Sequence, residues 1–503
     1  MLRISVCVLF GLAAAAAAIR TTAPFDAGWR FLTAGFGTRV PDAAPPITFH
    51  LSGPGHIQGR AVAILDEAAQ AGPASTTAIL AKEFSAGAFG AKGDGKTINT
   101  AAIQSAIDAA AKTDGTVTFA PGVYLTGALF LKSRVHFRVD EGVTIRGLQD
   151  IAAYPIMPTR VAGIEMQWPA ALLNVYEQSN VKISGHGTID GDGKIWWDQY
   201  WKMRREEYEP KGLRWAVDYD CKRPRLIQIY KSSAVDLEDL NLKRSGFWTV
   251  HICYSTKVTV DGLTIRNNTD GRGPSTDGID IDSSADVSVQ HCDIDCNDDA
   301  ICLKAGRDAD GLRVNRPSER VLIRDNTVRG GAAGVTFGSE TSGGMRDIEV
   351  SGLTVLKGVP NGILFKSAST RGGTIEKIAI HDVDLRGVGT AIAVAFNWNP
   401  SYSYAKMPDN YPNPPDYWRV LTEPVPPEKG LPHLRGVRIS NLKGVEVRQA
   451  FSVVSYQDSP IQDFTLQDVH IDAETAGSIA NAENWKFHNV VIQTADGSKL
   501  LRP

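Results

Sequence analysis

Beyond residue 18, the 503-residue chain has no apolar run long enough to span a bilayer. It also has no excess of basic residues, because 53 Lys and Arg are balanced by 56 Asp and Glu, for a formal net charge of −3 at pH 7. The first absence argues against a membrane protein and the second against a nucleic-acid-binding protein. We therefore expect neither a membrane nor a nucleic acid among its partners.

Cysteine is scarce too, with Cys 6 in the whole chain. Cys292 and Cys296 do not have the C-x₂-C spacing of a zinc site. Beyond Cys7 an odd number remains, between positions 221 and 302. We expect most of these to be buried as small apolar groups, and one disulfide is compatible with an oxidising compartment.

Residues 1–18 have the pattern of a secretory signal peptide. A positive start at residues 1–3 precedes a short apolar stretch at 4–12 and small alanines at 13–18. An uncleaved anchor is the alternative. We expect a secreted or periplasmic protein in which a small β-rich extension, residues 19–82, precedes the main domain at residues 83–503.

An apolar template recurs in the second half of the chain, with apolar residues at x, x+2, x+5 and x+7. Complete instances begin at Val235, Val258, Val287, Ile348, Ile378, Phe464 and Trp485, and incomplete ones at Val321 and Val437. The starts recur at similar intervals along the chain, with one exception. The wider gap between Ile378 and Val437 has room for two layers or for an insertion.

This template predicts stacked short strands. Each alternating pair places two side chains inward on a strand, and the three-residue step spans a bend into the next strand. A period of about 20–30 residues with little helix is typical of a solenoid, whereas propeller blades need about 40 or more residues. We predict an all-β fold, a right-handed single-stranded parallel β-helix with one long core.

A short helix is predicted before the repeat. Ile103 and Ile107 are four positions apart, on one face of this helix, and Asn99 or Thr100 is suited to cap its N-terminus. We expect this helix to cover the first layer of the β-helix.

Carboxylates cluster among apolar residues between positions 274 and 306. Asp298 and Asp299 are adjacent, so their charges repel unless one is protonated or both contact a cation or a substrate. Asp277 precedes Asp298 by close to one repeat, which predicts that it lies beside the pair in a neighbouring layer. The cluster suits acid/base hydrolysis of a glycosidic bond, with a calcium site or solvated turn acids as alternatives.

The same three carboxylates suggest a division of roles. Inverting hydrolysis needs acid and base groups about 6.5–9.5 Å apart, with a water between them and the sugar. Asp277 and Asp299 would hold that water while Asp298 contacts the glycosidic oxygen. Crowding would raise the pKa of one carboxyl and let it act as the acid.

Motifs in a fixed order between positions 84 and 373 resemble those of glycoside hydrolase family 28, the polygalacturonases and their relatives. They are FGAKGDG (89–95), GTIDG (187–191) followed by Trp196 and Trp197, RPRLI (223–227), FWTVH (247–251), TDGID (276–280), NDD (297–299) and GSE (338–340). The resemblance implies a pectin-lyase-like β-helix and an inverting hydrolase of pectic poly- or oligosaccharides without metal or other cofactor. It implies Asp298 as the general acid, with Asp277 and Asp299 activating water.

Two positions depart from the family pattern. Ala333 stands where the family has the histidine of Gly-His-Gly, and the family's Arg-Ile-Lys is Leu364-Phe365-Lys366 here. Only Lys366 is left as the predicted substrate-binding residue, and an ammonium cannot hold a carboxylate bidentately as a guanidinium does. A solvated lysine is the alternative. The departures argue against a standard endo-polygalacturonase and favour a relative that acts on a different pectic linkage. We expect exo-action on galacturonate-containing chains, with a rhamnogalacturonan hydrolase or α-L-rhamnosidase as alternatives.

Two aromatic-rich segments, residues 197–219 and 397–432, are candidate walls of a substrate groove. Loops on a solenoid carry its specificity, so two such walls would block one end of the groove and make the enzyme exo-acting. Surface loops packed on their own aromatic residues are the alternative. A polysaccharide lyase and a non-catalytic glycan-binding β-helix are the rival classes, and we expect a monomer.

Overall fold

The computed structural model describes residues 5–8, 17–20, 82–409 and 411–501. The chain divides into two compact units, Met1–Ile79 and Leu80–Pro503, with the boundary close to the predicted one. In the first unit the described residues form an antiparallel pair, β1 (Ser5–Val8) and β2 (Ala17–Arg20). Most of the predicted signal peptide and of the 19–82 extension lies outside the described residues.

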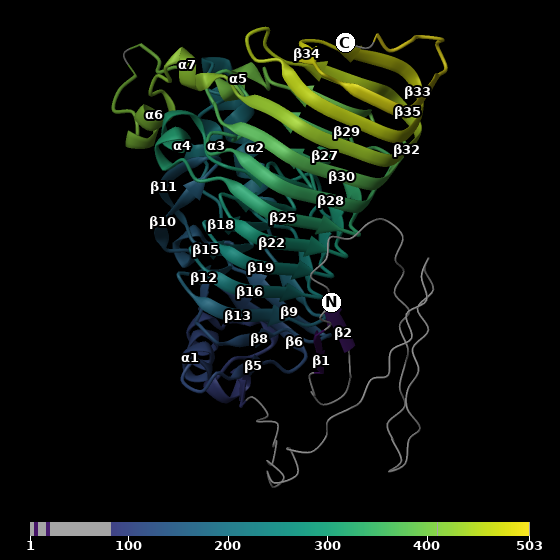
Figure 1. The fold of residues 1–503 in the computed structure, drawn as a ribbon. Helices are drawn as coiled ribbons and strands as arrows, with labels where there is room; N and C mark the ends of the chain where they lie inside the picture. Colours follow the sequence, from purple (N-terminus) through teal and green to yellow (C-terminus); the bar gives the residue numbers. More distant parts are fainter. Residues whose placement is uncertain (1–4, 9–16, 21–81, 410, 502–503) are drawn as a thin grey trace, which may run out of the picture. The chain divides into compact units, whose positions relative to one another are not determined.

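The second unit is a parallel β-helix whose stacked strands run from blue to yellow in Figure 1. Within the described residues, 31 strands join in one sheet made of three parallel ladders. The first ladder positions the site described below. It consists of β7 (Leu129–Leu131), β12 (Leu173–Tyr176), β15 (Ile227–Tyr230), β18 (Val250–Cys253), β21 (Ile279–Asp282), β24 (Ile301–Lys304), β27 (Ala333–Phe337), β29 (Asn361–Lys366) and β31 (Thr390–Ala395).

The other two ladders complete each layer. The second consists of β3 (Glu83–Ser85), β5 (Thr116–Thr118), β8 (His136–Arg138), β13 (Ser179–Ser184), β16 (Ser233–Glu238), β19 (Thr256–Asp261), β22 (Ala285–Gln290), β25 (Ser318–Arg324), β28 (Met345–Val355), β30 (Thr374–Arg386), β32 (His433–Val454), β33 (Ile461–Ile479) and β35 (Lys486–Thr494), with β34 (Ala482–Glu483) paired to β33. The third consists of β4 (Asp94–Ile98), β6 (Gly122–Thr126), β9 (Val143–Gly147), β14 (Thr188–Asp190), β17 (Asn241–Lys243), β20 (Thr264–Arg266), β23 (Asp293–Asp295) and β26 (Thr327–Gly330), which pairs with β28.

The predicted template is confirmed by the strand register. Its starting residues pair layer by layer from Val235 through Val258, Val287, Val321, Ile348, Ile378 and Val437 to Phe464. Each is at most 2% exposed and belongs to one continuous apolar core. Because Ile378 pairs directly with Val437, the wide gap between them is one layer with an insertion, not two layers.

The predicted helix is α1 (Thr100–Ala110), and it packs against the first layers with Ile103 and Ile107 fully buried. Asn99 is the N-cap residue, one of the two predicted, but it does not cap the helix through its side chain. Its amide instead accepts from the Lys92 N–H at 2.7 Å and donates to the Thr97 carbonyl at 2.7 Å, which closes the preceding turn.

Insertions between layers gather on one side of the β-helix (Figure 1). They comprise the hairpin β10 (Ile156–Val161) and β11 (Ile164–Pro169), then α2 (Lys194–Lys202), the π-helix η3 (Met203–Tyr208), η4 (Glu209–Lys211), α3 (Val217–Asp220), α4 (Asp308–Val314), α5 (Pro400–Ser403), α6 (Asp416–Leu421) and α7 (Pro427–Gly430). Two short 3₁₀ turns, η1 (Ala86–Phe89) and η2 (Ile151–Ala153), lie earlier in the chain. The insertions share a second apolar cluster that includes Trp168, Trp215 and Trp418.

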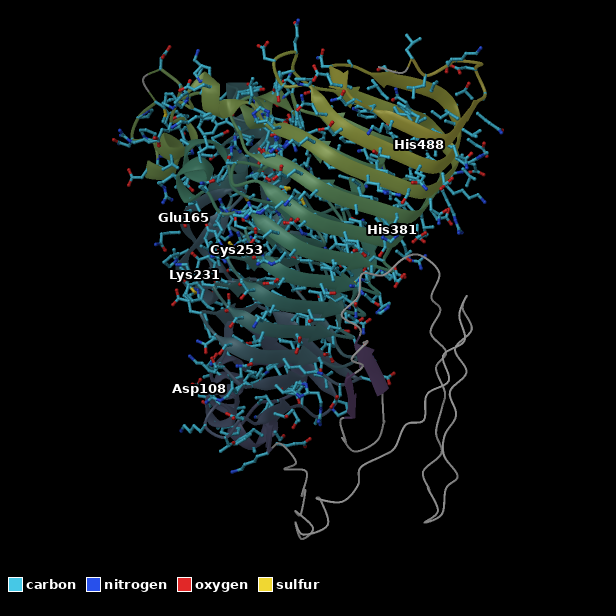
Figure 2. All side chains as sticks on the ribbon, in the orientation of Figure 1. Asp108, Glu165, Lys231, Cys253, His381 and His488 are labelled. Carbon is cyan, nitrogen blue, oxygen red and sulfur yellow. The ribbon has the colours of Figure 1, made fainter. Side chains whose placement is uncertain are left out.

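Side-chain positions agree with this arrangement. Figure 2 places Glu165 of the hairpin and Cys253 of β18 on one side of the β-helix, and His381 and His488 on the other. Tyr254, next to Cys253, donates a hydrogen bond to Glu165 at 3.1 Å.

The cysteines from Cys221 to Cys302 are buried and free, so none of them forms a disulfide. In the described part of the chain, no helix is long and apolar enough to cross a membrane.

Candidate active site

The three predicted aspartates lie where two strands of the first ladder begin. Asp277 precedes β21, and Asp298 and Asp299 precede β24. Ile279 pairs with Ile301 across these strands, and the Gly278 N–H donates to the Asp299 carbonyl at 2.9 Å. The register of the two strands therefore aligns Asp277 with Asp299. The repeat length had placed Asp277 opposite Asp298, which is one residue earlier and lies beside the aligned pair.

The structure brings these three side chains together. An oxygen from each of Asp277, Asp298 and Asp299 lies within 4.8 Å of an oxygen from each of the others. These closest approaches are shorter than the about 6.5–9.5 Å expected between the acid and base of an inverting enzyme. The cause is the fold, because two of the residues are adjacent and the third lies one layer away, about 4.8 Å in a parallel sheet.

Asp299 is surrounded by donors. The Lys366 ammonium lies 2.7 Å from one carboxylate oxygen, and the Thr336 hydroxyl donates to the other at 2.9 Å. Burial acts to raise the pKa of Asp299, but Lys366, Lys304 and these hydrogen bonds outweigh it and lower that pKa. Asp299 is therefore the carboxylate that is held ionised.

Asp298 has the opposite tendency. Burial and the neighbouring charge of Asp299 raise the pKa of its carboxyl above the ordinary value. Its carboxyl oxygen accepts the Asp299 N–H at 3.0 Å, and the residue is only partly buried. A carboxyl with a raised pKa that reaches the cavity beside an ionised one is the arrangement expected of a general acid.

Asp277 is 2% exposed, and one of its oxygens has no hydrogen-bond partner. Burial, then Asp280 and Asp298, raise its pKa well above the usual range. Asp277 therefore favours its protonated form, unlike Asp299. Its unpaired oxygen is free to contact a water or a substrate hydroxyl.

Lys304 holds this group of acids together, and sequence reasoning missed it. Its ammonium lies 3.5 Å from Asp277, 3.4 Å from Asp280 and 3.5 Å from Glu340, and 4.9 Å from the centre of the Trp248 ring. The sequence feature that could have identified Lys304 is its place as a single lysine at the end of the apolar strand β24, where it pairs in register with Asp282. A cation buried at 4% exposure needs carboxylates around it.

Glu340 and Asp280 respond differently to Lys304. For Glu340, burial acts to raise the pKa, but Lys304 and Arg371 outweigh it and bring the pKa to about 2. For Asp280, burial prevails over the attraction of Lys304 and raises the pKa to about 7. Two lysines thus balance two ionised carboxylates, Asp299 and Glu340, while the other three acids have raised pKa values.

The aspartates open into a cavity of about 120 Å³, here called the active-site cavity. Its lining consists of Ala162, Arg214, Asp218, Phe247, Trp248, Ser275, Asp277, Asp298, Asp299, Lys304, Ser339, Glu340, Lys366, Trp398, Asn399 and Tyr402. Both predicted aromatic walls contribute, the first through Arg214 and Asp218 and the second through Trp398 and Tyr402. The cavity is a small enclosure between the β-helix face and its insertions.

The predicted substrate-binding residue lies in this cavity, but its positive charge is already paired with a carboxylate of the protein. Lys366 is 5% exposed, with its ammonium on Asp299 and 4.8 Å from the centre of the Trp398 ring. Ala333 and Leu364, at the two positions that depart from the family pattern, form a buried apolar cluster with Ala393. No polar group replaces the family histidine and arginine at those two positions.

Among the described residues, two groups of side chains have the composition of a metal site. In one, Asp282 already contacts the Arg160 guanidinium at 3.0 Å and His251 at 3.3 Å, beside Cys253. The other is the aspartate trio, where Lys304 lies 3.5 Å from Asp277 and Lys366 lies 2.7 Å from Asp299. In both groups a protein cation already pairs with one of the carboxylates.

An acid with a raised pKa, a base held ionised and a cavity beside them on the face of a parallel β-helix define a hydrolase of the acid/base class. The chain belongs to glycosyl hydrolases family 28, whose family model matches residues 116–409, and is a glycoside hydrolase. A second model, described as rhamnogalacturonase A/epimerase, pectate lyase-like, matches residues 84–138. The predicted family, enzyme class and fold class are confirmed.

Named relatives and solved structures agree with this assignment. A probable polygalacturonase of Vitis vinifera is 26% identical over 394 residues, which cover 76% of this chain and 73% of that protein. An exo-poly-alpha-D-galacturonosidase of Dickeya chrysanthemi is 25% identical, over 67% of this chain and 62% of that protein. The crystal structure of a hyperthermoactive exopolygalacturonase from Thermotoga maritima has a TM-score of 0.70 at 27% identity, over 82% of this chain and 92% of that chain.

Proposed function

We propose that the protein is an exo-acting hydrolase that removes terminal galacturonate from pectic chains. The observation that carries this proposal is that both aromatic walls contribute residues to the lining of the active-site cavity. Tyr417 and Trp418 of the second wall also donate to Asp220, the residue of α3 that directly follows the first wall, at 2.6 and 3.0 Å. A groove closed at one end admits the end of a chain and excludes its middle. The two exo-acting relatives support the same conclusion.

In the proposed mechanism, Asp298 donates its proton to the glycosidic oxygen as the bond to the anomeric carbon breaks. A water held by Asp299 and Asp277 attacks that carbon, and Asp299 accepts the proton of the water. Lys366 keeps Asp299 ionised, and Lys304 holds Asp277 in place. One water is consumed, and each turnover releases one sugar and a chain shortened by one unit.

Product sizes from polygalacturonate test the exo mode. Galacturonate monomer should be the product from the first minutes, while the viscosity of the polymer falls slowly. A ladder of oligomers with rapid loss of viscosity would contradict exo-action.

We also propose inversion at the anomeric carbon. Proton NMR of the first product should show the β-anomer released from an α-linkage, and an α-anomer would contradict inversion.

A rhamnogalacturonan hydrolase is the second candidate. The apolar cluster of Ala333, Leu364 and Ala393 favours it, because a site without the family arginine suits a sugar without a carboxylate. The rhamnogalacturonase-type match at residues 84–138 points the same way. Faster release of reducing ends from rhamnogalacturonan than from polygalacturonate would favour this candidate over the first.

We propose export from the cytoplasm on the basis of the pattern in residues 1–18. Fractionation of the producing cells, followed by N-terminal sequencing, tests this proposal. A protein that begins near position 19 outside the cytoplasm is expected, and an intact Met1 on cytoplasmic protein would contradict it.

A further inference from the structure

Arg214 is a cation of the active-site cavity to which neither the proposed mechanism nor the family motifs assign a role. It lies between η4 and α3, in the insertion that forms the first aromatic wall, and its side chain is 14% exposed. It therefore belongs to a wall added to the β-helix, whereas the catalytic aspartates come from the β-helix itself.

The guanidinium of Arg214 has at least one N–H group without a hydrogen-bond partner. One terminal nitrogen contacts Asp218 at 2.5 Å, whereas Nε is buried without a hydrogen-bond partner. The centre of the Tyr402 ring of the second wall lies 5.3 Å from the guanidinium carbon, a cation–π contact. Tyr402 in turn donates to Glu340 at 3.0 Å. Both insertions thus hold one guanidinium at the cavity.

The other cations that line the cavity are occupied. Lys366 lies on Asp299 at 2.7 Å, and Lys304 is shared by Asp277, Asp280 and Glu340. Among the cations of the described lining, Arg214 is the one with a buried side-chain nitrogen, Nε, that has no hydrogen-bond partner. A planar guanidinium is also the side chain best suited to hold a carboxylate, through two parallel hydrogen bonds.

We propose that Arg214 binds the carboxylate of the terminal uronate and so determines the specificity of the exo site. This inference rests on the proposed function, because it names the group that recognises the same substrate. Position 364 carries a leucine, so the carboxylate would be bound by an arginine from the insertion instead of one from β29.

The test compares binding of galacturonate with binding of galactose, which lacks the carboxylate, by NMR titration of the intact protein. The wild type should bind galacturonate at least about 10-fold more tightly. Arg214→Gln should weaken galacturonate binding by about 10- to 100-fold, the range for hydrogen bonds to a charged group, and leave galactose binding unchanged. Arg214→Lys should give an intermediate loss.

A purely structural role for Arg214 would weaken both sugars alike, and that result would overturn the proposal. Equal affinity of the wild type for the two sugars would also overturn it. Arg204→Gln is the matched control, because Arg204 lies in the same insertion, contacts Glu209 at 2.7 Å and stacks over Trp201, but does not line the cavity. Both affinities should be unchanged in this variant.

The titrations also separate this inference from the proposed function. If the wild type released no galacturonate from polygalacturonate, the proposed function would fail. The preference for galacturonate over galactose, and its loss in Arg214→Gln, would still be decided by the titrations alone.

Discussion

Single side chains decide which of the crowded carboxylic acids keeps its proton. Asp298 and Asp299 are neighbours in sequence, yet their pKa values move in opposite directions. The difference comes from Lys366, which contacts only Asp299 at salt-bridge distance. The sequence predicted the aspartates and the lysine, but not that the lysine is the partner of one of them.

Replacing Lys366 tests this division of roles. Lys366→Met removes the cation that lowers the pKa of Asp299, so the ionised base should be present only at higher pH. The acidic limb of the kcat–pH profile should move upward, with a loss of about 10-fold or more at acidic pH and a smaller change in KM. Lys377→Met, at an exposed lysine 3.6 Å from Asp347, is the control.

The alternative outcome for Lys366→Met is also informative. A rise in KM with an unchanged acidic limb would mean that Lys366 binds substrate, as the sequence pattern predicted. It would contradict the assignment of Lys366 as the residue that keeps Asp299 ionised.

Asp280 should make stability depend on pH. Its pKa is raised from 3.8 to about 7, so the native state binds more protons than the unfolded state between these values. Stability is therefore lost as pH rises from about 4 to 7, by on the order of 4 kcal/mol at full ionisation. Asp280→Asn carries no charge at any pH, so the loss should be absent in this variant.

Urea unfolding at pH 5 and pH 8 measures this effect. Asp280→Asn should gain stability relative to the wild type at pH 8 and gain much less at pH 5. An equal effect at both pH values would show that the carboxyl does not titrate in this range.

One acceptor supplies several of the contacts between the two insertions, in addition to the packing of Trp215 against Trp418. Asp220 of α3 accepts from Tyr417 and Trp418 of α6, and from Tyr208 of η3 at 2.8 Å. The sequence predicted both aromatic walls as separate segments. It could not predict their contact, because the segments are far apart along the chain and neither follows the apolar template.

Removing that acceptor should open the cavity. Asp220→Ala leaves three donors unpaired, and each hydrogen bond to a charged group is worth about 1.5–3 kcal/mol. Amides of α6 should exchange with solvent at least about 10-fold faster, and longer oligomers should appear among the products. The exposed Asp416 of the same helix provides the control variant Asp416→Ala. Unchanged exchange in Asp220→Ala would contradict the contact.

Across the whole chain, periodic burial made the fold predictable. The first position of the template pairs with its equivalent in the next layer from Val235 to Phe464, so an apolar pattern along the sequence reports a core that is continuous in space. The period accounts for Asp277 lying beside Asp299, whereas Asp298 was predicted from its place next to Asp299 and Lys366 from the family resemblance. The roles of Lys304 and Arg214 depend on contacts between layers and insertions, and no periodic pattern in the sequence predicts such contacts.

The charge balance of the whole site predicts independence from metal ions. Lys304 and Lys366 already neutralise Asp299 and Glu340, and the remaining acids have raised pKa values. Treatment with a strong chelator should leave the rate on pectic substrate unchanged within about 2-fold. Loss of activity that calcium restores would instead mean that the aspartate trio binds an ion.

The most direct test of the account is the rate of Asp298→Asn on two substrates. Asparagine keeps the shape of the acid but cannot protonate the leaving oxygen, so turnover of polygalacturonate should fall by about 10²–10⁴-fold. An aryl galacturonide with a good leaving group needs little protonation and should lose much less. Near-normal turnover of polygalacturonate by Asp298→Asn would contradict the role of Asp298 as the general acid.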